Sequence, residues 1–293
     1  MSSERRTPAY LPQKFFELCS DEGVLNALVD AKSYVSHNVN PIRELSKIYY
    51  DWKGGTQAIR IDGVTAEFDA ESKNGGDIIR IMNKSEKFFL QDMLSELNET
   101  DVFYDIGANI GIFSCFAAQK LENGHLVSFE PYPPNVNQLE KNILYNTTDS
   151  NFTLFDIALS NSDGTIEFSS PDKHPGHQTG NISPSGQSID IQATTGDKLV
   201  SNKSLPQPTV VKIDVEGSEP FVIEGLEDTL KSEACRVLYC EIHLPREDGG
   251  RPSVLDYGET KESMLNKIQD MGFNIEHMAE RGPEIQIKAK KQI

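Results

Sequence analysis

Carboxylate side chains stand at the ends of several apolar, strand-like runs in this sequence. The clearest case is VVKIDVEGSEP at 210–220, where Asp214 and Glu216 close the run and Glu219 follows a single glycine. Carboxylates crowded into an apolar setting lose hydration and repel one another unless a positive group lies between them. We therefore expect a positive group at this point of the fold.

A glycine loop, DIGANIG at 105–111, follows another apolar run. Glycines let the backbone turn sharply and approach a ligand closely. The spacing of Gly107 and Gly111 departs from the G-x-G-x-x-G of dinucleotide folds, and Asp105 adds negative charge where a pyrophosphate would be bound. S-adenosylmethionine fits better, because Asp105 would attract its ammonium and sulfonium end while loop amides receive its carboxylate.

Two further acids end the next apolar runs along the chain. Glu130 follows HLVSF, where a carboxylate can grip a ribose diol, and Asp156 in LFDIALS is placed to accept from an adenine amino group. Each acid alone is typical of a solvated strand end or turn. Three acids ending successive strands of one βαβαβ unit indicate a nucleoside cofactor, and S-adenosylmethionine ahead of NAD.

The elements that must position these residues alternate between strand and helix from residue 100 onward. This rhythm predicts βαβ units and a parallel sheet with helices on both faces, closed by an antiparallel pair, FNIEHMAE and PEIQIKAK. GTIEFSS and QSIDIQAT are predicted strands around a Pro-, Gly- and Ser-rich segment. We expect residues 170–190 to form an active-site loop.

The chain is predicted to divide at residue 84. Residues 1–83 would form an N-terminal extension with helices and a hairpin of TQAIRID and VTAEFDA, which could contact substrate or a second copy of the chain. Residues 84–293 would form the domain that binds the cofactor.

Four segments in this order resemble the FkbM-type S-adenosylmethionine-dependent methyltransferases: FYDIGANIGIFS, VSFEPYPPNVNQLEKNI, DIALSNSDGTIEF and VVKIDVEGSEPFVIEG. The resemblance covers roughly residues 84–243. It implies a Rossmann-like class I methyltransferase sheet of seven strands in the order 3-2-1-4-5-7-6, with strand seven antiparallel. It also implies O-methylation, usually of a sugar or natural-product hydroxyl.

The resemblance carries cofactor contacts onto this chain residue by residue. Those implied are Glu86, Asp105, Gly107, Ala108, Asn109, Gly111, Glu130, Pro131, Asp156 and Ala158. The match at Glu86 is looser than the others. The first 80 residues and the 170–190 loop match nothing in the family pattern, so we expect them to choose the substrate.

A base within hydrogen-bond reach would assist methyl transfer to a hydroxyl. The candidates stand at the ends of the fourth and fifth strands: Asp214, Glu216, Glu241 and His243. His243 has the most suitable unperturbed pKa for a base, although a strand-end histidine satisfied by a neighbouring carboxylate is the alternative. Glu219 is expected to serve the first turn of its helix.

A hard divalent cation is the mechanistic alternative at these strand ends. Asp214, Glu216 and Glu241 could bind one through their oxygens. Nothing in their spacing demands an ion, so no metal is predicted. Outside this class, an NAD-dependent sugar-nucleotide oxidoreductase and a non-catalytic nucleoside-binding module remain as alternatives.

Charge and composition limit the partners. The formal net charge of −17 repels nucleic-acid phosphates, so we expect no nucleic-acid partner. No window approaches the length of a membrane span, no signal peptide is evident, and the four cysteines show no framework spacing, which together favour a reduced, cytoplasmic setting. The expected acceptor is a small molecule or saccharide, with a sugar hydroxyl favoured and a sugar carboxylate possible. A homo-oligomer is compatible with the sequence.

Overall fold

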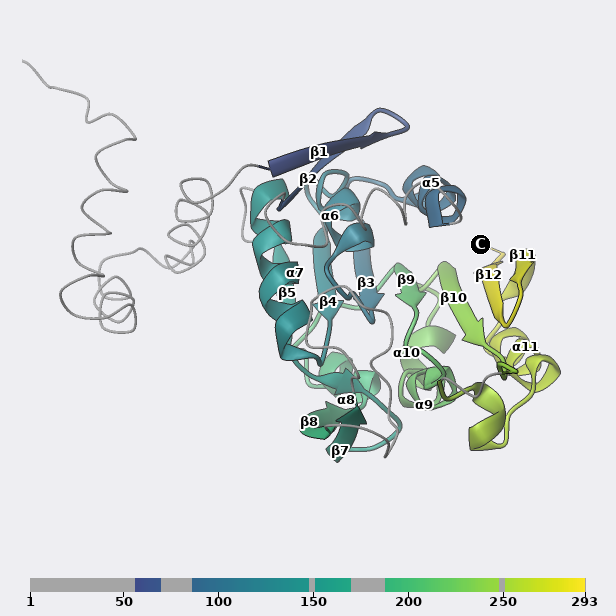
Figure 1. The fold of residues 1–293 in the computed structure, drawn as a ribbon. Helices are drawn as coiled ribbons and strands as arrows, with labels where there is room; N and C mark the ends of the chain where they lie inside the picture. Colours follow the sequence, from purple (N-terminus) through teal and green to yellow (C-terminus); the bar gives the residue numbers. More distant parts are fainter. Residues whose placement is uncertain (1–55, 70–85, 148–150, 170–187, 248–250, 293) are drawn as a thin grey trace, which may run out of the picture.

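The structure, a computed structural model, describes residues 56–69, 86–147, 151–169, 188–247 and 251–292 (Figure 1). The helices expected in the N-terminal extension and most of the expected 170–190 loop lie outside the described residues.

A seven-stranded sheet forms the centre of the molecule, in the order β11-β12-β10-β9-β3-β4-β5. Five strands are parallel: β3 (Val102–Ile106), β4 (His125–Phe129), β5 (Phe152–Phe155), β9 (Val210–Ile213) and β10 (Val237–His243). The last strand, β12 (Glu284–Lys290), runs antiparallel both to β10 and to β11 (Asn274–Arg281). Numbered along the chain, these strands lie in the order 3-2-1-4-5-7-6. The predicted fold class, a mostly parallel sheet between helices, is confirmed.

Helices cover both faces of this sheet (Figure 1). One face carries α5 (Glu86–Glu96), α6 (Ile112–Ala118) and α7 (Pro133–Asn146). The other face carries α8 (Gly196–Ser201), α9 (Glu219–Gly225), α10 (Glu227–Lys231), the 3-10 turn η1 (Val254–Tyr257) and α11 (Lys261–Asp270). The helical segment that follows β9 is divided into α9 and α10 at the fully buried Leu226.

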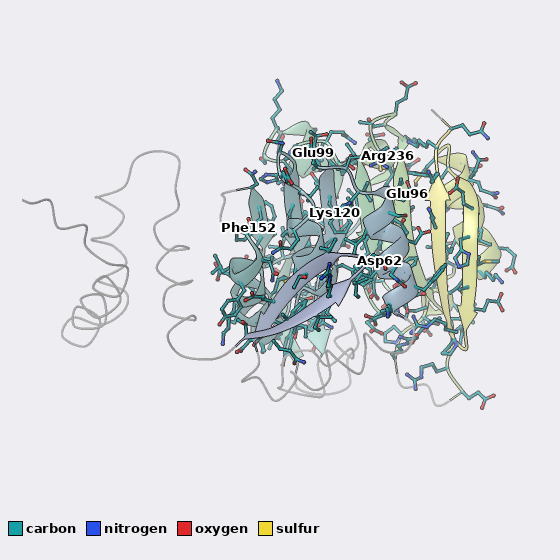
Figure 2. The ribbon with its side chains drawn as sticks, turned by 90° about the horizontal axis from the view of Figure 1, so that it is seen from above. Asp62, Glu96, Glu99, Lys120, Phe152 and Arg236 are labelled. Atoms are coloured by element: carbon teal, nitrogen blue, oxygen red, sulfur yellow. The ribbon has the colours of Figure 1, made fainter. Side chains whose placement is uncertain are left out.

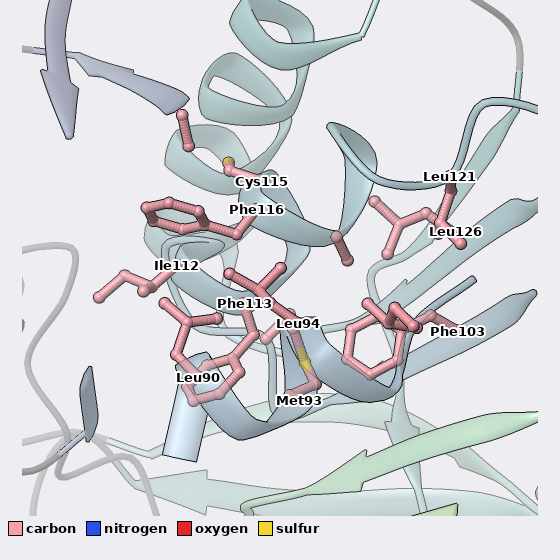
Figure 3. Packing of buried hydrophobic residues seen from close by; sticks show 14 of the residues in the cluster. Leu90, Met93, Leu94, Phe103, Ile112, Phe113, Cys115, Phe116, Leu121 and Leu126 are labelled. Atoms are coloured by element: carbon pink, nitrogen blue, oxygen red, sulfur yellow. The ribbon is translucent and has the colours of Figure 1, made fainter. Parts of the chain in front are cut away.

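Two hydrophobic clusters lie on opposite faces of the sheet, and strand alternation assigns residues to them. Phe103 and Val210 point to the α5 and α6 side, whereas Tyr104 and Val211 point to the α9 and α11 side. Figure 3 shows how side chains of α5 and α6 pack on Phe103 and on Leu126 of β4. The same alternation places polar residues near the carboxyl ends of the strands on the α6 side, namely Asp105, Ser128, Lys212 and Glu241.

A β-hairpin of β1 (Thr56–Ile61) and β2 (Val64–Asp69) packs on α6 and α7. The hairpin itself is confirmed as predicted, and it shares a core cluster with the sheet through the buried Phe68. Its turn also reaches α5, because Gln91 donates to the labelled Asp62 at 2.7 Å (Figure 2).

Buried asparagines of α7 attach the hairpin by hydrogen bonds. Asn142 Oδ1 accepts from the Asp69 backbone N–H at 3.0 Å, and its Nδ2 donates to the Ile110 carbonyl at 2.7 Å. Asn146 bonds both backbone groups of Glu67. Asn142 therefore links the hairpin to the loop that follows β3.

A small second sheet stands beside the carboxyl ends of the central strands (Figure 1). It contains β6 (Ala158–Leu159), β8 (Ser188–Thr194) and β7 (Gly164–Ser169) in that order. The strands predicted from GTIEFSS and QSIDIQAT correspond to β7 and β8, which pair with each other and lie apart from the main sheet. Among the described residues, no helix is both long and apolar enough to cross a membrane.

Replacement of Asn142 by leucine tests the link between hairpin and loop. The substitution leaves the Asp69 N–H and the Ile110 carbonyl without their partner, so the free energy of unfolding should fall by about 1–3 kcal/mol. Urea denaturation measures this fall. The exposed Asn123→Ala serves as the control and should change stability by less than about 0.5 kcal/mol. Equal stability of Asn142→Leu and the wild type would contradict the assignment.

Candidate active site

A buried lysine, Lys212 of β9, lies at the centre of the strand ends. Its Nζ lies 3.1 Å from Asp105 Oδ1, 3.7 Å from Asp214 Oδ2 and 3.1 Å from the Gly107 carbonyl. Burial alone would lower the pKa of Lys212, but Asp105 and Asp214 outweigh it and raise the pKa well above its ordinary value, so the ammonium is kept. Lys212 is the positive group that the crowded acids of 210–220 require.

Asp105 is fully buried beside this lysine. Besides its ion pair with Lys212, its Oδ2 accepts from Ser114 Oγ of α6 at 2.6 Å. The negative charge of Asp105 is therefore compensated by Lys212 of the same chain. From the sequence, we expected this charge to attract the cationic end of the cofactor. Alternation explains the difference, because Asp105 and Lys212 are register partners on adjacent strands and share one face.

The loop after β3 passes very close to the end of β9. Gly107 has φ +75°, and a Cβ added to it would lie 1.8 Å from the Asp214 carbonyl oxygen. Asn109 also has positive φ, its backbone N–H donates to Glu130, and its Oδ1 is buried without a hydrogen-bond partner among the described residues. Gly111 ends the loop at φ +90° against Leu139. The loop thus offers a backbone cradle and one unused buried acceptor.

Glu130, just after β4, faces this loop. It accepts from the backbone N–H groups of Asn109 at 2.8 Å and Tyr132 at 2.9 Å, and from Asn135 Nδ2 at 3.4 Å. Burial raises the pKa of Glu130 to about 7, although these hydrogen bonds favour the ionised form. The side chain is thereby fixed at the strand end predicted for a ribose contact.

An apolar pocket opens beside Glu130, between the central strand ends and the small sheet. Its lining includes the predicted contacts Gly107, Pro131 and Ala158, together with Phe129 and Phe168. Asp156 precedes Ala158 and is exposed.

His243 at the end of β10 is the centre of an acidic cluster. Its ring is buried, and its Nδ1 lies 2.7 Å from Glu219 Oε1. Its Nε2 faces three other carboxylates, at 3.6 Å from Glu216 Oε2, 3.8 Å from Asp214 Oδ1 and 4.0 Å from Glu241 Oε1. All four catalytic candidates from the sequence are therefore brought together.

The cluster shifts the pKa values of its members. Burial alone would lower the pKa of His243, but Glu219, Glu216 and Asp214 raise it to about 10. Burial, with Asp214 nearby, raises the pKa of Glu216 to about 7 and that of Glu241 to about 8. A histidine whose pKa is raised is protonated at neutral pH, so the unperturbed pKa that favoured His243 as a base does not apply.

Two arginines close the cluster on the side of β12. The buried Arg251 contacts Glu216 at 2.6 Å and Glu284 at 3.0 Å. Arg281 Nη1 lies 3.7 Å from Glu241 Oε2 and is buried without a hydrogen-bond partner among the described residues.

Glu86 begins α5 and approaches the same region from the opposite side. It is partly buried, and burial with the charge of Asp214 raises its pKa to about 7, while Lys212 and Arg281 act against this shift. Glu86, which matches the family pattern less closely than the other residues, therefore lies near the strand ends.

Sequence reasoning missed part of this site. Lys212 could have been found, because a lysine two residues before Asp214 in a buried strand must share its face. Glu219 is fully buried and holds both His243 and the Gly217 N–H, a larger role than the helix-end role expected. No sequence pattern places Arg251 or Arg281 in the site, because only tertiary packing brings them to the ends of β9 and β10.

The fold and the loop together define the class of this protein. A parallel sheet in the order 3-2-1-4-5-7-6, with a glycine loop after its first strand and an acid after its second, is the architecture of class I methyltransferases. The family profile described as "Methyltransferase FkbM domain" matches residues 105–275. The chain belongs to the FkbM methyltransferase family, and it is a methyltransferase that uses S-adenosylmethionine rather than NAD.

Two curated relatives are similar to this chain. The hexuronic acid methyltransferase AglP of Haloferax volcanii is 32% identical over 213 residues, which cover 72% of this chain and 84% of that protein. The methyltransferase sdnD of Sordaria araneosa is 24% identical over 214 residues, 62% of this chain and 77% of that protein.

A solved structure, the methyltransferase FkbM from Methylobacillus flagellatus KT, aligns with a TM-score of 0.46 at 16% identity. The alignment covers 68% of this chain and 46% of that protein.

The residues present fit S-adenosylmethionine. The close backbone approach at Gly107, the unused Asn109 acceptor, the fixed Glu130 carboxylate and the apolar pocket beside Ala158 offer polar and apolar contacts for its parts.

The cradle at Gly107 can be tested with Gly107→Ala. The added methyl group meets the Asp214 carbonyl and also forces an unfavourable φ, so cofactor affinity should fall at least tenfold, as measured by calorimetry. Gly63→Ala is the matched control, because Gly63 also has positive φ, at +86°, but has nothing within 4 Å. If both variants bind the cofactor equally well, the loop is not the cradle.

The buried ion pair can be tested with Lys212→Met. Removing the ammonium leaves Asp105 charged, buried and unpaired, and should cost about 3–5 kcal/mol of unfolding free energy in urea denaturation. Adding Asp105→Asn to this variant should restore part of that loss, since the uncompensated charge is then gone. An additive double mutant would show that the two side chains do not interact.

Proposed function

We propose that this chain methylates an oxygen of a saccharide, with hexuronic acid-containing saccharides as the first acceptors to test. The observation that supports this most directly is the accessible carboxylate of Asp214 beside the cofactor loop. Its side chain is 31% exposed, against 17% for Glu216 and 10% for Glu241. Asp214 is thus the member of the cluster that an acceptor hydroxyl meets first.

Ionised carboxylates only accept hydrogen bonds, and sugar hydroxyls donate them. Asp214 is fixed on one side by Lys212, so its free oxygen edge can hold an acceptor hydroxyl in place. When bound, the cofactor supplies an electrophilic methyl group. Asp214 then orients the acceptor oxygen and receives the proton that this oxygen gives up on methylation.

An acidic acceptor needs a positive contact in this acid-rich site. Arg281 offers one, because its Nη1 is buried, lacks a hydrogen-bond partner among the described residues and lies at the edge of the cluster. The name of the relative AglP supports the same substrate class, since that protein is described as a hexuronic acid methyltransferase.

Labelled methyl transfer to a panel of uronic acid and neutral glycosides tests the proposal. We expect transfer to uronic acid glycosides, and Asp214→Asn should lower turnover by about 10²–10⁴-fold with cofactor affinity retained, because the proton acceptor is removed. Mass spectrometry and NMR of the product locate the methyl group.

The control is Asp163→Asn, an exposed acid paired with Lys198 away from the cluster, which should leave turnover unchanged. Wild-type turnover in Asp214→Asn would remove Asp214 from the reaction. Labelling of the sugar carboxylate would contradict the role of Asp214 as acceptor of a hydroxyl proton, and labelling of no glycoside would contradict the saccharide proposal.

A further inference from the structure

The Nε2 atom of His243 is buried and faces a set of carboxylate oxygens that do not hydrogen-bond to it. The ring is 1% exposed, and its nearest oxygens are 3.6 Å and 3.8 Å away, on Glu216 and Asp214. These distances exceed those of a hydrogen bond. Nε2 therefore faces a space bounded by carboxylates that lie beyond hydrogen-bond distance from it.

We propose that this space binds a divalent cation through His243 Nε2, Asp214 Oδ1 and Glu216 Oε2. Ligand atoms of these three residues all lie within 4.8 Å of one another. An ion held at about 2.0–2.2 Å from each ligand allows separations up to about 4.4 Å, so shifts of a few tenths of an ångström complete the site. The fold adds a nitrogen ligand that the acidic set considered from the sequence lacked.

Glu219 supports this assignment from behind the ring. Its Oε1 lies 2.7 Å from Nδ1, and carboxylates in this position hold a histidine so that its other nitrogen points to a metal. Glu219 Oε1 also accepts from the Gly217 N–H at 3.0 Å, which fixes the carboxylate itself. Binding of the cation displaces the proton on Nε2, while the hydrogen on Nδ1 stays bonded to Glu219.

Basic side chains hold the two acidic ligands in place. Lys212 lies 3.7 Å from Asp214 Oδ2, and the atom offered to the ion is the other oxygen, Oδ1. Arg251 contacts Glu216 Oε2 at 2.6 Å and orients that carboxylate. A second possible set, Glu241, His243 and Glu284, does not include Asp214, the most accessible acid of the cluster.

Three protein ligands leave coordination positions open, as in catalytic metal sites. Asp214 is the most accessible of the ligands, so the open positions face the acceptor side. We assign these positions to two oxygens of the acceptor. This role rests on the proposed function, whereas binding of the ion does not.

Mn²⁺ is the probe, added to the full chain after treatment with a chelator and without methyl donor or acceptor. Electron paramagnetic resonance should show one bound Mn²⁺ per chain at an ionic strength of about 0.15 M, where surface charges are screened. Pulsed measurements should show coupling to a histidine nitrogen. Binding with nitrogen coupling supports the site even if every glycoside fails in the transfer assay.

Variants assign the ligands. Asp214→Asn should weaken Mn²⁺ binding at least tenfold, and His243→Ala should remove the nitrogen coupling. Glu227→Gln, an exposed acid paired with Lys231, is the control and should bind as wild type. Circular dichroism confirms folding, and Asp214→Asn keeps the test valid if His243→Ala fails to fold. No binding, binding without nitrogen coupling, or equal loss in Glu227→Gln would overturn the proposal.

Discussion

The buried ammonium of Lys212 is the interaction on which the carboxyl ends of the sheet depend. Without it the buried Asp105 would carry an unpaired charge, and the partly exposed Asp214 would lose a cationic neighbour. Lys212 also binds the Gly107 carbonyl, so the same group that compensates the charges fixes the start of the cofactor loop. Electrostatics and loop geometry are therefore set by one side chain.

Around this lysine the strand ends separate two chemical environments. Residues on one face of the sheet form the charged cluster of β9 and β10, while the pocket that includes Ala158 and Phe168 is mostly apolar. A nucleoside and a sulfonium amino acid require different surroundings, and the pleat of the strands supplies both within a few residues. Gly107 lies where the two environments meet.

The elements of the central sheet followed from the sequence because each parallel strand is an apolar run that a turn and a helix follow. Asp214, Glu216, Glu241 and His243 could be grouped because parallel strands end at one edge of a sheet. What could not be predicted was which charges pair. The fully buried state of Asp105, the approach of Arg251 and the contact between Glu219 and His243 depend on packing between segments far apart in the chain.

Asn142 couples the stability of the hairpin to that of the cofactor loop. One side chain bonds the backbone of Asp69 on one side and of Ile110 on the other. Thermodynamic linkage requires that a ligand which holds the loop in this conformation also resists opening of the hairpin, and that the two effects are equal in free energy. Cofactor binding at the loop would then also stabilise the hairpin, about forty residues earlier in the chain.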